Sequence, residues 1–351
     1  MPNEPELTRR RAAILAAVVE EHVKTAAPVG SKVVQEKHGV DASTATIRNE
    51  MCVLERRGFI EQPHTSAGRI PADKGYRTYV DALMGRRSPS ADEMAWVRAQ
   101  YRRVADRTHE AIYRTTSAVL SQLTSAPAMV MAAPPGQSIM TAIKLTPVSS
   151  QVIVFSYETS TSGAHQCLVN SPEPLTAEQV AALSQALERH CVGRAAGALT
   201  ICRPQTIEEE MAPHAVPVAL LDEIKLAVEQ DRGEQVYVDG AAYALNYPEF
   251  QTMERLRPVM EALDEDKTVR RLLRPATRRG RMTVTIGREQ NIGALKQSSV
   301  IARHYEGPGG DAGALGIIGP TRIDYQAVIA IVDCVAEHVA QAFSKLSRAE
   351  E

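Results

Sequence analysis

The sequence predicts an α+β protein of two or three domains, on the evidence of its length, its periodicity and its charge distribution. At 351 residues the chain can bury a large core and divide into domains. Apolar residues recur at helical spacing near both ends, and alternating apolar and polar residues predict strands between them. The net charge is only −2, but residues 1–87 hold 14 Lys and Arg against 11 Asp and Glu. A modestly basic end on an acidic body is typical of a protein that offers that end to nucleic acid.

Two helices are predicted near the N-terminus, a long one and then a short one. Apolar spacing predicts the first over residues 8–24, with Thr8 as its N-cap. Ser31 is expected to cap a second helix that ends near Lys37. Gly39 then supplies the positive φ that a tight turn after a helix requires.

A third helix carries the functional prediction. Ser43 or Thr44 caps it, and it runs to Arg57. One face is apolar, and the helix could simply be a solvated amphipathic one, or it could read DNA. A recognition helix reads bases with its N-terminal residues, and asparagine, threonine and arginine are side chains that pair with base edges or phosphate. The predicted DNA-contacting residues of this segment are Ser43, Thr44, Thr46, Arg48, Asn49 and Arg56.

A short hairpin is predicted directly after that helix. Residues 59–62 read as a strand, 63–68 as a turn-rich tip, and Arg69 begins the return. Two helices, a turn and a basic hairpin form the layout of a winged helix-turn-helix, whose wing can touch the sugar-phosphate backbone. The predicted contacts from the wing and the segment after it are His64, Thr65, Ser66, Arg69 and Lys74. A further helix around residues 76–80 is expected to close this domain.

The body of the chain mixes predicted strands and helices. The long segment 91–125 reads as one helix, and 203–217 as a loop. The glycine-rich stretch 307–319 could be a phosphate cradle, but it lacks the residues of a P-loop and is better explained as a flexible hairpin. The Arg322–Asp324 pair is expected to cap the last helix. Strands are predicted at 139–145, 152–157, 165–169, 236–238, 281–286 and 299–304, and further helices at 175–191, 218–229 and 325–346.

Several longer motifs resemble one bacterial family. The segments PVGSK, STATIRNEM and EQPHTSAGRIP, and later VYVDGAAYALNYPEF, VTIGREQ and IIGPTRIDYQAVIAIV, are similar to those of the heat-inducible transcription repressor HrcA family and stand in its order. The resemblance covers most of the chain and is loose over residues 170–235. The chain departs from the family pattern at Arg288-Glu289, where a glutamate pair is common, and in the basic run 274–281.

The resemblance implies a domain plan. A winged helix-turn-helix would occupy residues 1–87, a connecting helix 88–125, a GAF-like α/β domain 126–170 and 236–351, and an inserted dimerising domain 171–235. It also implies a homodimeric, cytoplasmic repressor that binds the inverted-repeat CIRCE operator upstream of chaperonin and related heat-shock operons. In that scheme the chaperonin keeps the repressor in its DNA-binding form, and heat diverts the chaperonin to unfolded clients.

The sequence gives no sign of an enzyme, a cofactor or a metal site. No nucleophile motif appears, and the nine histidines have no metal-binding spacing. The five cysteines are scattered, which favours reduced thiols, and no secretory or membrane-spanning segment is predicted. Two alternatives remain open: a repressor gated by a small metabolite bound to the GAF-like domain, and an enzyme with a DNA-binding head.

Overall fold

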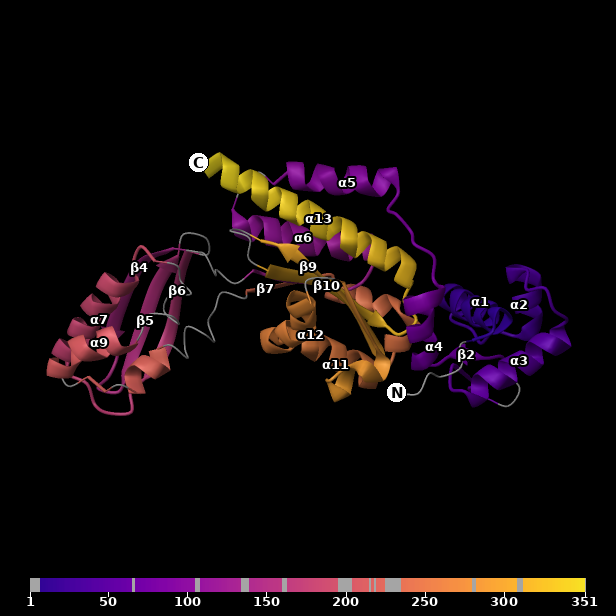
Figure 1. Ribbon diagram of the computed structural model, residues 1–351, viewed down its shortest axis with the longest axis horizontal. Coiled ribbons are helices and arrows are strands. Elements are labelled where there is room, and N and C mark those ends of the chain that lie inside the picture. Colours follow the sequence, from indigo (N-terminus) through magenta and orange to yellow (C-terminus); the bar gives the residue numbers. More distant parts are fainter. Residues whose placement is uncertain are drawn as a thin grey trace.

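The computed structural model describes residues 7–64, 67–104, 108–133, 139–159, 163–194, 204–214, 216–217, 219–224, 235–279, 282–307 and 312–350. These residues form three units in a row (Figure 1). The N-terminal unit lies at one end, a body built on a five-stranded sheet lies in the middle, and a three-stranded sheet with its helices lies at the other end. The α+β, multidomain class expected from the sequence is confirmed.

The N-terminal unit consists of three helices, a minimal hairpin and a closing helix. Its elements are α1 (Arg9–Thr25), α2 (Ser31–His38), α3 (Thr44–Arg56), β1 (Ile60–Glu61), β2 (Ile70–Pro71), α4 (Asp73–Thr78) and a π-helical turn, η1 (Tyr79–Leu83). Thr8 caps α1 as expected. The cap of α2 is Gly30 rather than Ser31, because Ser31 already lies within the helix, while Gly30 is extended with φ −90° and ψ 157°. Gly39 ends α2 in the left-handed region, with φ 60°.

The five-stranded sheet of the body is antiparallel throughout, in the order β7-β3-β10-β9-β8. Its strands are β3 (Ala128–Met131), β7 (Val236–Asp239), β8 (Thr283–Ile286), β9 (Ser298–Glu306) and β10 (Ala312–Pro320). Helices α6 (His109–Thr124) and α13 (Tyr325–Glu350) cover one face, and α11 (Met253–Asp264) and α12 (Asp266–Arg279) cover the other (Figure 1). Short 3₁₀ turns connect these elements: η3 (Ala241–Asn246), η4 (Pro248–Phe250), η5 (Gly287–Glu289) and η6 (Gly293–Leu295).

The central strand β10 corrects one prediction. The glycine-rich stretch 307–319 was expected to be a flexible hairpin between strands. Residues 308–311 lie outside the described residues, but Ala312–Pro320 is itself a strand that pairs with β3 on one side and β9 on the other. Gly316 faces a tight contact, since an added Cβ would clash with the carbonyl oxygen of Ile301. Close packing of β10 against its neighbour strand therefore requires glycine at this position. The resulting glycine content makes the strand look like a loop in the sequence.

The predicted single helix over 91–125 is wrong, because the chain forms two helices there. Helix α5 (Ala91–Arg102) ends with Arg103 as its C-cap. Helix α6 begins after Thr108, whose hydroxyl accepts a hydrogen bond from the Ala111 N–H at 3.2 Å. Both helices lie beside α13, so the segment belongs to the body instead of connecting it to the N-terminal unit (Figure 1). The connection is the irregular segment 84–90.

The three-stranded sheet at the far end has the order β4-β5-β6 and its own core. Its elements are β4 (Met140–Pro147), β5 (Val152–Thr159), β6 (Gly163–Asn170), α7 (Ala177–Cys191), α9 (Pro204–Met211) and η2 (Ala212–His214), with a further helical stretch over 219–224. The predicted strands are confirmed, but they belong to this inserted unit, so its boundary lies before Ile139 rather than after Asn170. The predicted loop over 203–217 is largely helix, because Ile207 and Met211 pack into the core at 4% and 2% exposure.

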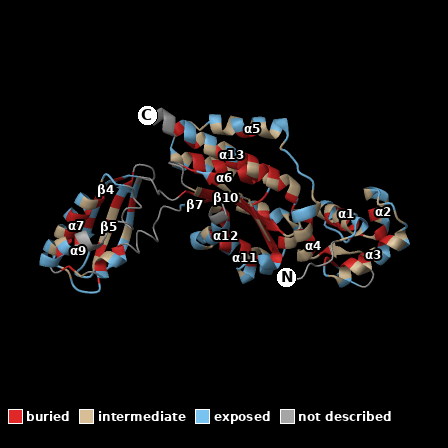
Figure 2. Ribbon diagram, in the orientation of Figure 1, coloured by how far each residue is buried: buried red, intermediate tan, exposed pale blue. Residues whose placement is uncertain are grey.

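Helix α13 is long and apolar enough to span a membrane by length and composition, with a mean hydropathy of 1.4 over its most apolar part. It nevertheless packs into the body: Val332, Val335 and Val339 have no exposed surface. The burial pattern in Figure 2 shows its buried side turned to the sheet and its exposed side turned outward. These contacts are those of a core helix in a folded domain.

Candidate nucleic-acid interface

Helix α3 is fixed in the N-terminal unit by one cap and one apolar face. The Ser43 hydroxyl accepts a hydrogen bond from the Thr46 N–H at 3.1 Å and lies 2.9 Å from the Thr46 hydroxyl, so Ser43, not Thr44, is the cap. Ile47, Met51 and Leu54 are buried at 4% exposure or less, as their spacing predicted. A helix held in this way presents a defined outward face.

The outward face of α3 carries unpaired polar side chains. Arg48 and Asn49 are exposed, and neither forms a hydrogen bond or ion pair with any residue that the structure describes. Arg56 is also exposed at the end of the helix, where its Nε lies 3.4 Å from the Cys52 carbonyl oxygen. Thr44 and Thr46 are half-buried at the start of the helix. Four of the predicted contact residues on α3 therefore lie near its N-terminus, and two of them, Arg48 and Asn49, have no partner among the described residues.

The hairpin is attached to both α1–α2 and α3. Arg69 pairs with Val29 through two backbone hydrogen bonds of 2.8 and 2.9 Å, and Gly68 permits this because an added Cβ would clash with the Val29 backbone. The Arg69 guanidinium also binds the Glu55 carboxylate through Nε at 3.0 Å and Nη2 at 2.9 Å. His64 is exposed at the tip, whereas Thr65 and Ser66 lie outside the described residues. Arg69 thus has a structural partner on α3, unlike Arg48.

Lys74 lies on α4, directly after the hairpin. Its Nζ is 4.7 Å from the centre of the Phe59 ring, and the guanidinium of Arg57 is 5.5 Å from the same ring. Contacts of this kind hold a cation over an aromatic face while its charge still faces solvent. The sequence did not indicate that Phe59 would organise these two cations.

Sequence reasoning missed two groups that shape the turn between α2 and α3. Gln35 donates a hydrogen bond from Nε2 to the Ala42 carbonyl oxygen at 3.0 Å. Glu21 is only 6% exposed and binds Lys37 Nζ at 2.5 Å and His38 Nε2 at 3.4 Å. The hydrogen bond from Lys37 lowers the pKa of Glu21, against the opposing effect of burial. The available signal was a glutamate at an apolar-face position of α1.

The predicted Arg322–Asp324 pair does not form. Asp324 caps α13 as expected, since its Oδ1 accepts the Ala327 N–H at 3.0 Å. Arg322 instead binds Glu249, with Nε 2.5 Å from Oε1 and Nη2 3.3 Å from Oε2. Its Nη1 also donates to the Val23 carbonyl oxygen of α1 at 2.6 Å. Arg322 therefore joins the body to the N-terminal unit rather than holding a ligand or its own helix.

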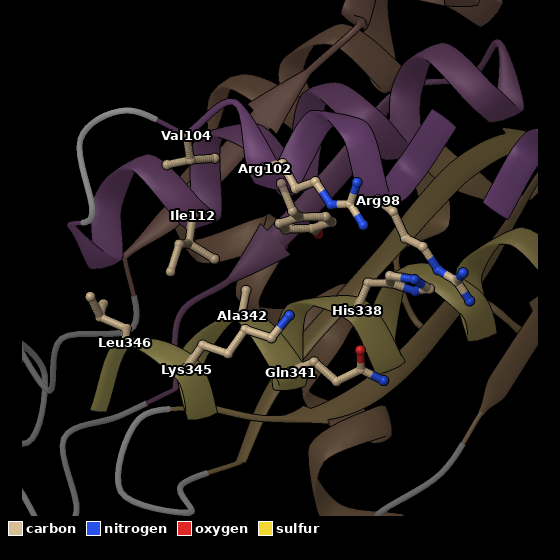
Figure 3. Close-up of a pocket in the computed structure, with 10 residues that line it drawn as sticks. Arg98, Arg102, Val104, Ile112, His338, Gln341, Ala342, Lys345 and Leu346 are labelled. Carbon is tan, nitrogen blue, oxygen red and sulfur yellow. The ribbon is translucent and has the colours of Figure 1, made fainter. Parts of the chain in front are cut away.

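A cavity of about 560 Å³ opens between α5, α6 and α13 (Figure 3). Arg98, Arg102 and Lys345 line its rim and form no ion pair with a described residue, while its walls include apolar side chains. In the described part of the chain, including this cavity, no group of three metal-binding side chains occurs. Cys52 and Cys334 are free thiols, and Cys202 lies outside the described residues.

Comparison with known proteins finds a matching family, similar sequences and one solved structure with the same fold. The family described as "HrcA protein C terminal domain" matches residues 110–329. A heat-inducible transcription repressor HrcA from Moorella thermoacetica is 33% identical over 345 residues, which are 97% of this chain and 99% of the relative. One from a Nocardioides species is 36% identical over 334 residues, 95% and 97% of the two chains. A crystal structure of a hypothetical protein shares the fold, with a TM-score of 0.60 at 23% identity over 97% of this chain and 100% of that one.

Fold and relatives together define a transcriptional repressor. The family model spans more than half of the chain, and the relatives match it almost from end to end. The chain belongs to the heat-inducible transcription repressor HrcA family, and its biological setting is regulation of the heat-shock response.

Proposed function

We propose that the N-terminal unit is a winged helix-turn-helix that reads operator DNA with α3 and touches the backbone with the hairpin. The observation that carries this proposal is the free pair Arg48 and Asn49 on a helix whose opposite face is buried. Asparagine pairs bidentately with adenine, and arginine pairs with guanine or phosphate. Ser43, Thr44 and Thr46 at the helix start would bind phosphate or base edges, as would Arg56, His64, Thr65, Ser66, Arg69 and Lys74 at its end and on the wing.

The protein would act on DNA as a homodimer, because an inverted repeat presents two equivalent half-sites. Two features of the inserted unit support the proposed dimer. Among the described strands, β6 pairs only with β5, which leaves its other edge available, and the adjacent sheet face exposes 67% of Leu168. An unpaired strand edge beside an apolar side chain suits pairing with a second copy of the same strand. Leu168→Asp is then expected to shift the protein toward monomer in sedimentation.

Membership of the family supports a proposal for the target and its regulation. The operator would be the inverted-repeat CIRCE element upstream of chaperonin and related heat-shock operons, in the cytoplasm. The body would be a GAF-like domain, and chaperonin would restore the folded dimer. Repression needs no chemistry, because a bound dimer occupies the promoter.

A binding titration tests this function directly. Purified full-length protein is titrated onto a CIRCE-type inverted repeat and onto a scrambled duplex, at several salt concentrations, with and without chaperonin. We expect specific binding at least about a thousand-fold tighter than binding to the scrambled duplex. Added chaperonin should raise the active fraction of repressor. Equal, weak binding to both duplexes by folded protein would reject the operator assignment.

The cavity between α5, α6 and α13 favours one second candidate, a repressor gated by a metabolite. Cavities of this size are typical of small-molecule sites, and the free cations Arg98, Arg102 and Lys345 would suit an anion with an apolar part. Decanoate is a suitable probe, with decanol as its uncharged counterpart. Gating would be supported if decanoate changes the operator affinity of the wild type, while decanol does not, and if decanoate has no effect on the Arg98→Gln variant. No change of operator affinity with decanoate would leave chaperonin as the regulator.

A further inference from the structure

The N-terminal unit is docked on the body by two charged contacts, and the first is centred on Arg77 of α4. Its guanidinium binds both carboxylate oxygens of Glu289, through Nε at 2.9 Å and Nη2 at 2.5 Å. Nη2 also donates to the Val284 carbonyl oxygen at 2.6 Å. The Arg77 and Glu289 side chains are 29% and 37% exposed, so the pair is partly shielded from solvent. Bidentate pairs of this kind fix direction as well as distance.

Backbone geometry at the same place reinforces the contact. The Arg288 N–H donates to Asp73 Oδ2 of α4 at 3.0 Å. Gly287 has φ 52° in the left-handed region, and an added Cβ there would clash with the Asp73 carboxylate. Glu289 is itself held in place, because its Oε2 accepts the Ile286 N–H at 2.9 Å. The VTIGREQ motif, residues 284–290, therefore forms a binding surface that is complementary to Asp73 and Arg77 of α4.

The second contact lies on the other side of the interface. Arg322, only 12% exposed, joins Glu249 of the body to the last turn of α1 through the Val23 carbonyl oxygen. Carbonyls at a helix C-terminus lack partners within the helix and favour a cation. Between the two charged contacts the rings of Tyr76 and Tyr325 meet at 5.8 Å between centroids, and both are buried. The interface thus has two directional contacts around one aromatic contact.

This arrangement contrasts with the covalent link between the units. Segment 84–90 has no helix or strand, and most of its residues are exposed. Units joined by such a segment move relative to one another unless an interface restrains them. The restraint here comes from residues more than 200 positions apart in sequence, since 212 positions separate Arg77 from Glu289.

We propose that these contacts, which we call the docking clamp (Arg77 with Glu289, Asp73 with the Arg288 N–H, and Arg322 with the Val23 carbonyl oxygen), are positioning elements for operator recognition. The inference rests on the proposed dimeric DNA binding. The clamp fixes the direction of α3 relative to the body, and hence the separation and angle of the two recognition helices in the dimer. With this geometry fixed, the dimer binds an operator of one half-site spacing more tightly than operators of other spacings. The reason is that binding of both half-sites adds affinity only where the two recognition helices can reach them at the same time.

The test compares clamp variants on operators of different spacing. Glu289→Gln removes the ion pair with little change of shape, and Gly287→Ala pushes Asp73 away. The matched control is Glu261→Gln, which removes a carboxylate from the Arg257–Glu261 pair on the surface of α11, at 2.7 Å in the native protein. Dissociation constants are measured for the native inverted repeat, for repeats with one or two base pairs added or removed, and for random DNA.

We expect wild type and Glu261→Gln to discriminate strongly between native and altered spacing. In the clamp variants that discrimination should fall by about tenfold, mainly through weaker binding to the native repeat, with binding to random DNA unchanged. Unchanged discrimination in both variants would overturn the proposal. So would tighter binding of the variants to the native repeat, since the clamp would then hold the unit in an inhibited orientation.

A measurement without DNA separates this proposal from the proposed function. Hydrogen exchange of the Arg288 amide, which Asp73 protects, is expected to accelerate in both variants and not in the control. Wild-type protein that cannot distinguish operator from scrambled DNA would reject the function, whatever the exchange data show. Faster exchange with intact spacing discrimination would reject only the positioning role. If Gly287→Ala does not fold, the isosteric Glu289→Gln change carries the test alone.

Discussion

Two sides of the N-terminal unit use the same kinds of side chain in opposite ways. On the outward side of α3, Arg48 and Asn49 are exposed and have no partner among the described residues. On the side that meets the body, Arg77 and Asp73 of α4 each bind a specific group across the interface. Both sides are polar, and both contribute to the modestly basic charge of residues 1–87.

The difference shows that net charge does not locate a nucleic-acid surface. An arginine that is paired with a carboxylate must break that ion pair before it can bind phosphate. For an unpaired arginine, the free-energy cost of binding phosphate is that of desolvation alone. Pairing therefore separates the side chains that organise the unit from those that remain available to a ligand. Arg69 stands between the two classes, because it holds Glu55 while its Nη1 has no partner among the described residues.

The largest effect is expected at the free side. Asn49→Ala should weaken the free energy of binding to the operator by about 1–3 kcal/mol and leave binding to random DNA unchanged. The reason is that the Asn49 amide forms its hydrogen bonds only with the matching base edge. Anisotropy titrations on operator and random duplexes measure both. The control is Asn246→Ala, which removes an exposed asparagine from the body. Equal losses on both duplexes would show that Asn49 does not read bases.

A smaller effect is expected at Arg69. Arg69→Ala should weaken binding to operator and random DNA alike and lower the slope of log K against log salt by about one unit, the signature of one lost phosphate contact. Glu55→Gln provides the comparison, since it breaks the ion pair but keeps the cation, and its slope should stay at the wild-type value. A slope that Arg69→Ala leaves unchanged would confine Arg69 to holding the hairpin on α3.

Local signals explain why the N-terminal unit could be predicted from sequence. Its helix ends depend on nearby residues, such as the Thr8 and Ser43 caps and the left-handed Gly39, and the apolar face of α3 follows directly from spacing. The errors there are small shifts: the cap of α2 is Gly30 instead of Ser31, and the closing helix begins at Asp73 instead of near Tyr76. Which polar residues of α3 stay unpaired could not be predicted, because that depends on Glu55, Phe59 and other neighbours in space.

The body was harder because its decisive contacts are remote in sequence. The strand β10 has the composition of a loop, and only its pairing with β3 and β9 makes it central. Arg322 was assigned to Asp324, two positions away, but its partner Glu249 is 73 positions away. The resemblance to a family supplied the order of the domains, yet it did not indicate that VTIGREQ and TRIDY would face the N-terminal unit.

The smallest effect should come from acid, and it tests the docked side alone. Partial burial works to raise the pKa of Glu289, but hydrogen bonds from Arg77 and from the Ile286 N–H outweigh it and place the pKa below its ordinary value. A carboxylate with a lowered pKa in the folded state stabilises that state fully above its unfolded pKa of about 4.3, and this contribution is lost as the pH falls through the lowered value. Protection of the Ile286 amide, which donates to Glu289, should therefore decline below about pH 4.3 once it is corrected for intrinsic exchange.

The Glu289→Gln variant decides whether this pH dependence belongs to the clamp. A glutamine cannot titrate, so the variant should show weaker protection of the Ile286 amide at neutral pH and little further decline on acidification. The outward side of α3 serves as the internal reference, because its orientation depends on the buried Ile47, Met51 and Leu54, which do not titrate. If acid loosens the wild type and Glu289→Gln equally, the clamp responds to other carboxylates. The contrast between a docked side set by ion pairs and a free side set by apolar packing would then fail.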